Sequence, residues 1–410
     1  MNQTSAAGAV AASQPPPLIL LVAISAIGPI ALNIFMPSMP GMQSVFGVDY
    51  ATVQLTLTFY LFAMAISQLV FGPLSDRFGR KPMLVIGLAC FITGSVLATL
   101  APTIELLIAA RLVQGLGGAA GVAIGRAIVR DCYSRERSAS MIGYVTMGMV
   151  VGPMVSPYIG GRLDEVFGWQ AGFVAVAGVA LPVLVMVVVA LRETRQRDVT
   201  QDADRAVFAP LMRGAAVLFR SRAFWGYALA MGFASAAFFS FLAAAPYLAV
   251  DVMGLSPSAY GTYFPLGAVG YMLGNFLSGK MSERAGPDRM ILAGNIIGIA
   301  ATAGMMALAL GGALHPLALF VPMAFVALSN GLVLPNAIAS CVSIRPEFAG
   351  AASGLSGALQ LLVGGLSTIL AGHLQDGTLV PISLVMAGTI WLSVMAAWCG
   401  RRALRRAGSA

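Results

Sequence analysis

Residues 72–81 read Gly-Pro-Leu-Ser-Asp-Arg-Phe-Gly-Arg-Lys and form a charged stretch between two long uncharged segments. A second copy, GKMSERAGPDR, follows later in the chain, so that Asp76 recurs as Glu283 and Gly79 as Gly286. Both pairs have the same offset of 207 residues (283 − 76 and 286 − 79). A fixed long-range repeat in an apolar chain indicates two duplicated halves, which is the organisation of many secondary transporters.

The composition places the chain in a membrane. It is 58% hydrophobic and only 10% charged, whereas a soluble domain carries roughly 25% charged residues. The uncharged runs are as long as the roughly 20 apolar residues that a spanning helix needs, or multiples of that length. The formal charge of +8 could suggest a nucleic-acid partner. The basic residues, however, lie in short loops between apolar runs, which is typical of an orientation signal.

The apolar runs predict an all-α membrane protein with twelve transmembrane helices in two pseudo-symmetric six-helix bundles. The predicted spans are 18–39, 51–73, 82–101, 104–127, 139–161, 168–191, 223–247, 258–279, 290–311, 316–340, 349–372 and 378–400. The corresponding domains are a tail (1–17), an N-terminal bundle (18–191), a linker (192–222), a C-terminal bundle (223–400) and a second tail (401–410). Within the linker, a surface amphipathic helix over 207–219 is an open alternative to a fully solvated segment.

The distribution of Arg and Lys predicts the orientation. With the loop at Asp76 placed in the cytoplasm, only Arg111 and Arg162 of the 24 basic residues fall outside the cytoplasmic loops and tails. We therefore expect both termini in the cytoplasm, and a multi-pass protein of the bacterial inner membrane. The four cysteines, which have no metal-ligand spacing, are interpreted as buried reduced thiols: Cys90, Cys132, Cys341 and Cys399.

The stretch GPLSDRFGRK resembles the cytoplasmic loop signature of the major facilitator superfamily. In that family the aspartate latches onto the start of span eleven, here near 348–351, and the arginine pairs with an acid that ends span four. The resemblance therefore implies a conformational latch with no catalytic role. Its positions in this chain are Gly72, Asp76, Arg77, Gly79, Arg80, Lys81 and Asp131, with Glu283 and Arg284 in the second copy.

Span five is dense in helix-breaking residues, which predicts a kinked and closely packed helix. Its string GPMVSPYIGG resembles the antiporter signature of drug-exporting members of the family, with Ser156 where that pattern has glycine. Close packing alone is the alternative interpretation. The positions concerned are Gly148, Gly152, Pro153, Pro157, Gly160 and Gly161.

Four further strings resemble the bicyclomycin/chloramphenicol-resistance (Bcr/CflA-type) subfamily of drug/proton antiporters: AIGPIALNIFMPSMP (26–40), RAIVRDCY (126–133), APYLAVDVMGLSP (245–257) and LPNAIAS (334–340). The resemblance implies multidrug efflux by proton antiport and alternating access. One departure concerns Asn33, which stands where that subfamily has an aspartate within span one. Asparagine cannot titrate, so protons would have to be coupled elsewhere, with Glu105 or an acid near an interface as candidates.

A cationic drug in a low-dielectric cavity favours a carboxylate partner, and no carboxylate lies deep in any predicted span. We therefore expect neutral or weakly anionic, amphenicol-like ligands. Arg111 lies inside span four, where a charge costs some 2.5 kcal/mol or more unless it faces protein or a cavity; snorkelling to the surface is the alternative. The candidate substrate and coupling residues are Asn33, Tyr60, Glu105, Arg111, Gln114, Phe238, Phe239 and Asn330.

Other function classes lack their motifs. The sequence contains no GxxxxGK[ST] phosphate loop for an ATP-driven pump and no HExxH or GxSxG motif for a hydrolase. We expect no enzyme activity, no metal site and no cofactor, with the proton gradient as the energy source. The expected partners are a small-molecule drug and the lipid bilayer, with no nucleic acid and a monomeric state. An importer or metabolite exporter on the same scaffold, with or without coupling to protons, remains an alternative.

Overall fold

The computed structural model describes residues 15–133, 135–195 and 207–408, and every regular element in those ranges is helical. Most of the predicted first tail and the middle of the linker lie outside the described residues. The elements are α1 (Leu18–Ile34), η1 (Met36–Ser38), α2 (Met39–Phe46), α3 (Tyr50–Phe78), α4 (Arg80–Thr99), α5 (Ile104–Gly118), α6 (Ala120–Cys132), α7 (Arg135–Phe167), α8 (Gln170–Ala190), α9 (Ala209–Leu218), α10 (Arg222–Pro246), η2 (Tyr247–Val252), α11 (Pro257–Thr262), α12 (Phe264–Ala285), α13 (Pro287–Leu310), α14 (Pro316–Ile344), η3 (Pro346–Phe348), α15 (Ala349–His373) and α16 (Val380–Gly408).

Eleven stretches of these described helices are long and apolar enough to cross a membrane: Leu18–Phe46, Tyr50–Phe78, Arg80–Thr99, Ile104–Cys132, Met141–Phe167, Gln170–Ala190, Arg222–Val252, Pro287–Leu310, Pro316–Ile344, Pro346–His373 and Val380–Arg406. The predicted span 258–279 covers most of α11 and the larger part of α12. Helix α12 ends in a charged turn and is not among these eleven stretches. It nevertheless packs along α14, where Gly270 and Gly274 lie against the backbone of Ala324 and Leu328. The chain is a multi-pass, all-α membrane protein.

Three predicted spans are divided between helices: the first, the fourth, and the eighth, in which α11 and α12 meet at Tyr263. The first span continues past its predicted end at residue 39, because α1 stops at Ile34 and the chain proceeds through η1 into α2. Pro37 and Pro40 lie in this segment, and proline removes a backbone donor, so a single straight helix cannot form there. The fourth span consists of α5 and α6, which meet at Ala119. Span five, by contrast, is the uninterrupted helix α7.

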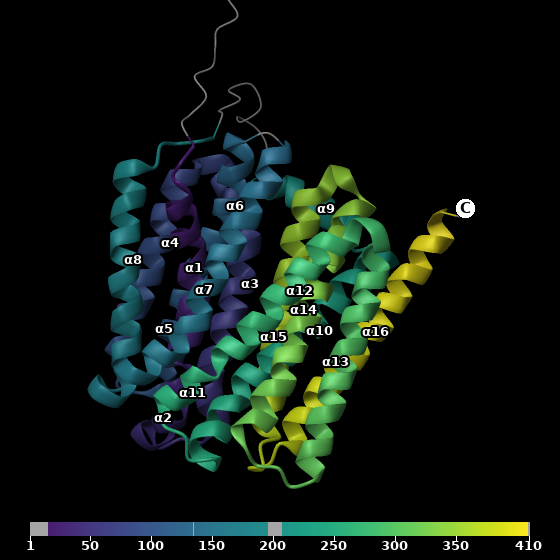
Figure 1. The fold of residues 1–410 in the computed structure, drawn as a ribbon. Coiled ribbons are helices and arrows are strands. Elements are labelled where there is room, and N and C mark those ends of the chain that lie inside the picture. Colours follow the sequence, from purple (N-terminus) through teal and green to yellow (C-terminus); the bar gives the residue numbers. More distant parts are fainter. Residues whose placement is uncertain (1–14, 134, 196–206, 409–410) are drawn as a thin grey trace, which may run out of the picture.

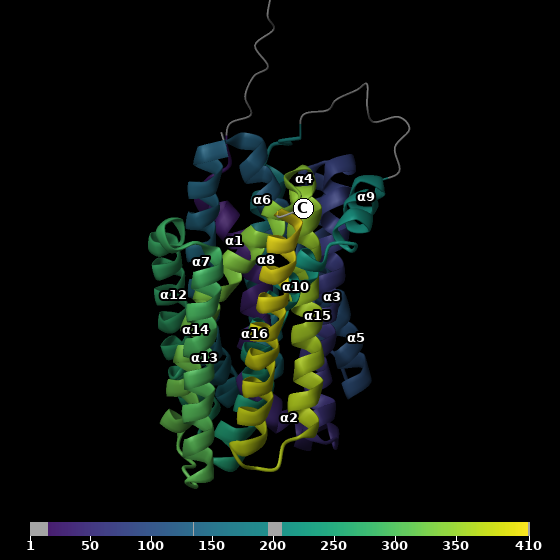
Figure 2. The same cartoon turned by 90° about the vertical axis from the view of Figure 1, so that its right-hand side faces the viewer.

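The two halves lie side by side, with α1–α8 in purple to blue-teal and α10–α16 in green to yellow (Figure 1). Helices α2 and α11 mark one end of the molecule, and both views place α6 and α9 toward the other end (Figures 1 and 2). Because α3 and α12 start next to α2 and α11, their C-terminal turns with Asp76 and Glu283 share the opposite end. We call the end with α2 and α11 the Asp49 face, and the end with the two loops the Asp76 face.

Hydrogen bonds join the two halves at the Asp49 face. The Tyr50 hydroxyl donates to the Ala243 carbonyl (3.0 Å) and the Gln43 amide donates to Asp251 (2.7 Å). Asp49 itself caps α3, and the bonds from Thr52 lower the pKa of its carboxyl. At the Asp76 face, by contrast, the Asp76 side chain is 66% exposed. The halves are therefore closed together at the Asp49 face.

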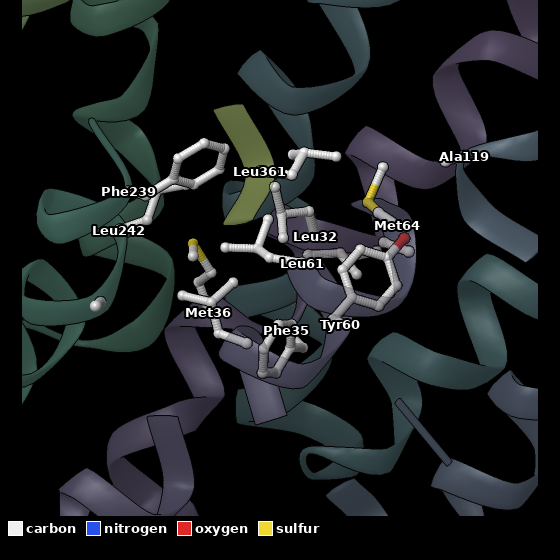
Figure 3. Packing of buried hydrophobic residues seen from close by; sticks show 14 of the residues in the cluster. Leu32, Phe35, Met36, Tyr60, Leu61, Met64, Ala119, Phe239, Leu242 and Leu361 are labelled. Carbon is white, nitrogen blue, oxygen red and sulfur yellow. The ribbon is translucent and has the colours of Figure 1, made fainter. Parts of the chain in front are cut away.

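Buried apolar side chains from both halves form one packed cluster. Figure 3 shows Leu32 and Leu61 from the first half near Phe239, Leu242 and Leu361 from the second. Small residues allow close helix approach in the first half, since a side chain at Gly28 or Gly121 would collide with the backbone of Gly118 or Ile24. The prediction of four buried thiols is wrong in part: Cys341 is buried, Cys90 and Cys132 are half-buried and Cys399 is exposed. Cys399 is exposed because it lies on the outer side of α16.

Candidate functional site

A cavity of about 250 Å³ lies between the two halves. Helices α1 and α7 line it from the first half, and α10, α12, α14 and α15 line it from the second. Its wall is almost entirely apolar. The lining residues are Pro29, Leu32, Asn33, Met149, Val150, Pro153, Met154, Ser235, Phe238, Phe239, Phe241, Phe264, Gly267, Ala268, Tyr271, Phe320, Met323, Ala327, Asn330, Leu334 and Gln360.

Four of the eight predicted substrate and coupling residues line this cavity: Asn33, Phe238, Phe239 and Asn330. The other four do not. Tyr60, Arg111 and Gln114 form a separate buried cluster, and Glu105 lies in the first turn of α5, close to the Asp49 face. The cavity-lining residues of α12 and α15, such as Tyr271 and Gln360, could not be identified from the sequence, because they belong to no motif.

Asn33 is 3% exposed, and one of its two side-chain polar atoms has no hydrogen-bond partner in the described part of the chain. Its amide nitrogen donates to the carbonyl of Pro29 (2.8 Å), one turn earlier in α1. A carbonyl only accepts, so this contact fixes which end of the amide faces Pro29. The Oδ1 atom has no hydrogen-bond partner within the described part of the chain. Of the residues lining the cavity, none is a carboxylate.

Arg111 is fully buried, so the snorkelling alternative is wrong. Its guanidinium lies 3.9 Å from the Tyr60 ring centroid and 4.2 Å from that of Phe35, and it donates to Gln114 and to the Ala31 carbonyl (3.3 Å). The Tyr60 hydroxyl donates to the Gly28 carbonyl (2.9 Å). Aromatic faces attract a cation and partly replace its lost hydration. Arg111 thus fastens α5 to α1 and α3 within the first half.

The glycines of the antiporter string hold α7 against its neighbours. A side chain at Gly148 would meet Val22, one at Gly152 would meet Ile30, and one at Gly160 would collide with the Ile34 carbonyl, all in α1. Gly161 instead lies against Pro257 of the second half. Pro153 lines the cavity, and Pro157 lies beside Gly261 of α11. The string therefore combines a packing role with a place in the cavity wall.

The loop at Asp76 contains a buried arginine. Arg80 is 7% exposed, and its guanidinium pairs with Asp131 at the end of α6 (2.8 Å) and with Asp76 (2.5 Å). The two residues that the resemblance pairs, Arg80 and Asp131, are in contact. Gly79 adopts φ +103°, a conformation that favours glycine. Gly72 has open space where a side chain would lie.

The start of the linker binds to the same loop. The Glu193 carboxylate accepts from the backbone N–H groups of Arg80 (2.9 Å) and Lys81 (3.1 Å), which are the first residues of α4. A helix N-terminus has unpaired N–H groups and favours a negative charge. Lys81 donates to the Val188 carbonyl (2.7 Å), and Arg195 donates to the carbonyl of Arg77. No sequence motif marks Glu193, because its cap on α4 depends on the packing of α8 against α4.

The start of α15, which the resemblance names as the partner of Asp76, contacts a different element here. A side chain at Gly214 of α9 would lie 2.7 Å from Ala351 and 3.3 Å from Phe348. Helix α9 occupies part of the stretch 207–219 for which the sequence left an amphipathic helix open.

Comparison with known proteins identifies the family. The family model of the Major Facilitator Superfamily matches residues 21–368. The chain is 26% identical over 382 residues to the "bicyclomycin resistance protein homolog" of Haemophilus influenzae, covering 92% of this chain and 94% of that protein. It is 28% identical to multidrug resistance protein D of Escherichia coli over 375 residues (90% and 91%), and 27% identical to the chloramphenicol resistance protein of Pseudomonas aeruginosa over 381 residues (91% and 85%).

Solved structures show the same fold. A bacterial homologue of the human lysosomal transporter Spinster, in an inward-facing and unoccupied conformation, superimposes with a TM-score of 0.71 at 18% identity, covering 95% of this chain and 96% of that one. The match of the family model extends over most of both halves and includes the loop at Asp76. The chain belongs to the Major Facilitator Superfamily of membrane transporters.

Proposed function

We propose that this protein exports small amphiphilic drugs across the bacterial inner membrane by alternating access. The observation that carries the proposal is the apolar cavity that both halves share while they are closed together at the Asp49 face. Ligand sites of this kind combine apolar walls with a few polar anchors. Three relatives named for resistance to bicyclomycin, to several drugs and to chloramphenicol support export as the direction.

The cavity wall favours neutral or weakly anionic substrates of amphenicol-like character. A buried cation requires a compensating negative charge, and the residues lining the cavity offer none. Aromatic rings of Phe238, Phe239 and Phe264 supply apolar contact area. Asn33 and Asn330 supply the amides that could orient a hydroxyl or an amide of the ligand.

Proton antiport, without any cofactor, is the proposed source of energy. Asn33 cannot carry the proton, so we assign the coupling to acids that hold the halves together at the Asp49 face. Asp251 accepts from Gln43 (2.7 Å), and Glu165 accepts from the backbone N–H of Ser258 (2.9 Å). Protonation would remove the charge that strengthens each bond and would favour separation of the halves on that face.

The positive-inside rule places the Asp76 face and both termini in the cytoplasm. The structure then corresponds to the state that is closed toward the outside. When the halves close at the Asp76 face instead, Asp76 is the proposed latch to the start of α15. We further propose that the protein works as a monomer.

The test is drug accumulation in cells with and without the protein, each with and without a protonophore. We expect lower accumulation of chloramphenicol in the expressing cells, restored by the protonophore, and no export of a permanent lipophilic cation. Glu165→Gln and Asp251→Asn should weaken the proton dependence, whereas Asp376→Asn, a carboxylate at the same face outside these contacts, should not. Higher accumulation in expressing cells would instead make the protein an importer, and export insensitive to the protonophore would contradict proton antiport.

A further inference from the structure

Two helix pairs connect the halves on either side of the cavity. One pair is α3 with α15, and the other is α7 with α12. We call them the α3/α15 seam and the α7/α12 seam. The duplicated sequence suggests that they are alike, but the structure gives them different contacts.

The α3/α15 seam is closed over most of its length. A side chain at Gly357 would lie 2.5 Å from Gln68, one at Gly365 would lie 2.5 Å from the Phe62 ring, and one at Gly372 would collide with Gln54. The hydroxyls of Thr58 and Thr368 are hydrogen-bonded across the seam (2.6 Å). From Gln54 to Gln68 these contacts follow about 21 Å of helix. No ligand could pass between helices packed this closely.

In the α7/α12 seam, α7 packs more extensively against the short helix α11 that precedes α12 than against α12 itself. There, Gly161 lies against Pro257, and Gly261 lies against Tyr158. Toward the Asp76 face, both helices of the seam line the cavity: Met149, Val150, Pro153 and Met154 from α7, and Gly267, Ala268 and Tyr271 from α12. A side chain at Gly267 would meet no atom within 4 Å.

The outer side of this seam is apolar. Only 17% of the most apolar part of α7 is buried inside the protein, against 56% for α3. Beside the cavity-lining residues, α7 exposes Met147 and Val151, and α12 exposes Val269, Leu273 and Phe276. Lipid chains would contact these residues in a bilayer. These exposed residues and the cavity-lining residues of α7 and α12 therefore form an apolar surface that extends from the membrane to the cavity wall. None of them carries a charge.

We propose that the substrate enters the cavity sideways, between α7 and α12, from the bilayer leaflet at the Asp76 face. The occupant of this entrance is an amphiphile dissolved in that leaflet. The identity of this occupant rests on the proposed function, but the opening of the seam to lipid does not. A ligand that arrives from the membrane keeps its apolar part out of water throughout. Its apparent KM, expressed as aqueous concentration, should therefore fall in proportion to its membrane–water partition coefficient.

The first test places a photoreactive benzoylphenylalanine at Gly267 in protein reconstituted into lipid nanodiscs. We expect a covalent phospholipid adduct at position 267 after illumination. Gly304 of α13, where a side chain would also meet no atom within 4 Å, is the positive control. Benzoylphenylalanine in place of Phe62, which lies in the closed α3/α15 seam, should form an adduct with α15. Lipid adducts at 304 but none at 267 would overturn the proposal. This readout requires no transport, so it is independent of whether the protein exports drugs.

The second test compares Gly267→Trp with Gly304→Trp, two changes for which the structure leaves room. The first should slow the initial extraction of a membrane-dissolved fluorescent substrate by roughly threefold or more, because entry would become the limiting step; the second should not. Because Gly267 also lines the cavity, each variant is assayed with a membrane-dissolved substrate and with a water-soluble one. An entrance from the bilayer predicts that Gly267→Trp slows transport of the membrane-dissolved substrate more than that of the water-soluble one. Equal losses for both substrates would indicate an altered cavity wall alone and would contradict an entrance there.

Discussion

The two copies of the duplicated loop share a backbone but differ in chemistry. Gly79 and Gly286 both have positive φ, +103° and +81°. Each ends its helix in the same way, with its N–H donating to the backbone carbonyl of the residue four positions earlier, Ser75 (3.1 Å) or Ser282 (3.0 Å). A side chain disfavours this conformation, so glycine is retained wherever the turn is retained.

The side-chain contacts of the two loops are unrelated. The first loop has the buried pair between Arg80 and Asp131. At the same offset of 207, Pro287 stands in the place of Arg80, so the pair has no counterpart. Asp288 instead accepts from the Tyr227 hydroxyl (2.7 Å) and pairs with Arg401 (3.3 Å).

This difference assigns different tasks to the loops. The first loop connects α3, α4, α6 and the start of the linker through charges, which a movement between helices can break and remake. The second loop connects α13 to α10 and α16, all within one half. The backbone geometry is common to both copies, and the buried ion pair occurs only in the copy for which we propose a switching role.

The largest expected effect is that of Arg80→Ala. It would leave Asp131 and Asp76 without their cation, and breaking such a buried pair costs about 3 kcal/mol. We expect a lower unfolding midpoint in detergent and loss of efflux. Arg401→Ala in the second loop is the matched control and should retain efflux, because its pair with Asp288 is more exposed. Equal losses in both variants would contradict the division of tasks between the loops.

An intermediate effect is expected for alanine at the two glycines. Gly286→Ala should cost about 1 kcal/mol from the positive φ alone, because a side chain there would meet no atom within 4 Å. Gly79→Ala should cost about 2 kcal/mol, since its side chain would also lie 2.6 Å from Glu193 and displace the cap of α4. Unfolding midpoints of the two variants, measured side by side, give the difference. If Gly286→Ala proved the more damaging of the two, the linker contact would have no energetic role.

The smallest effect is expected for Tyr227→Phe. It removes one hydrogen bond to Asp288 and should cost about 1 kcal/mol of stability. Asp288 retains Arg401, so we expect an unchanged efflux rate. The comparison variant is Tyr144→Phe, whose side chain is exposed, and which should change neither stability nor rate. A strong loss of efflux in Tyr227→Phe would mean that the second loop also takes part in switching.

Much of the fold could be read from the chain itself. Uncharged runs of membrane length and the repeated loop predicted an all-α, multi-pass protein, and the family assignment through GPLSDRFGRK is confirmed by the match to residues 21–368. Of the candidate site, Asn33, Phe238, Phe239 and Asn330 lie in the cavity wall as proposed lining residues. The predictions of fold and family rest on hydropathy, turn glycines and motif strings, which are local properties of the chain.

The positions of the other site residues were decided by the tertiary structure, because they depend on which helix faces pack together. Span four carries both Arg111 and Gln114, yet its packing against α1 and α3 turns them away from the cavity. Glu193 becomes the cap of α4 only when α8 packs beside it. The sequence determined that the helices cross the membrane in two related halves; only the packing decided which side chains face the cavity and which seam is open. An apolar helix can present any of its faces at nearly equal cost in lipid, so contacts with neighbouring helices fix its rotation.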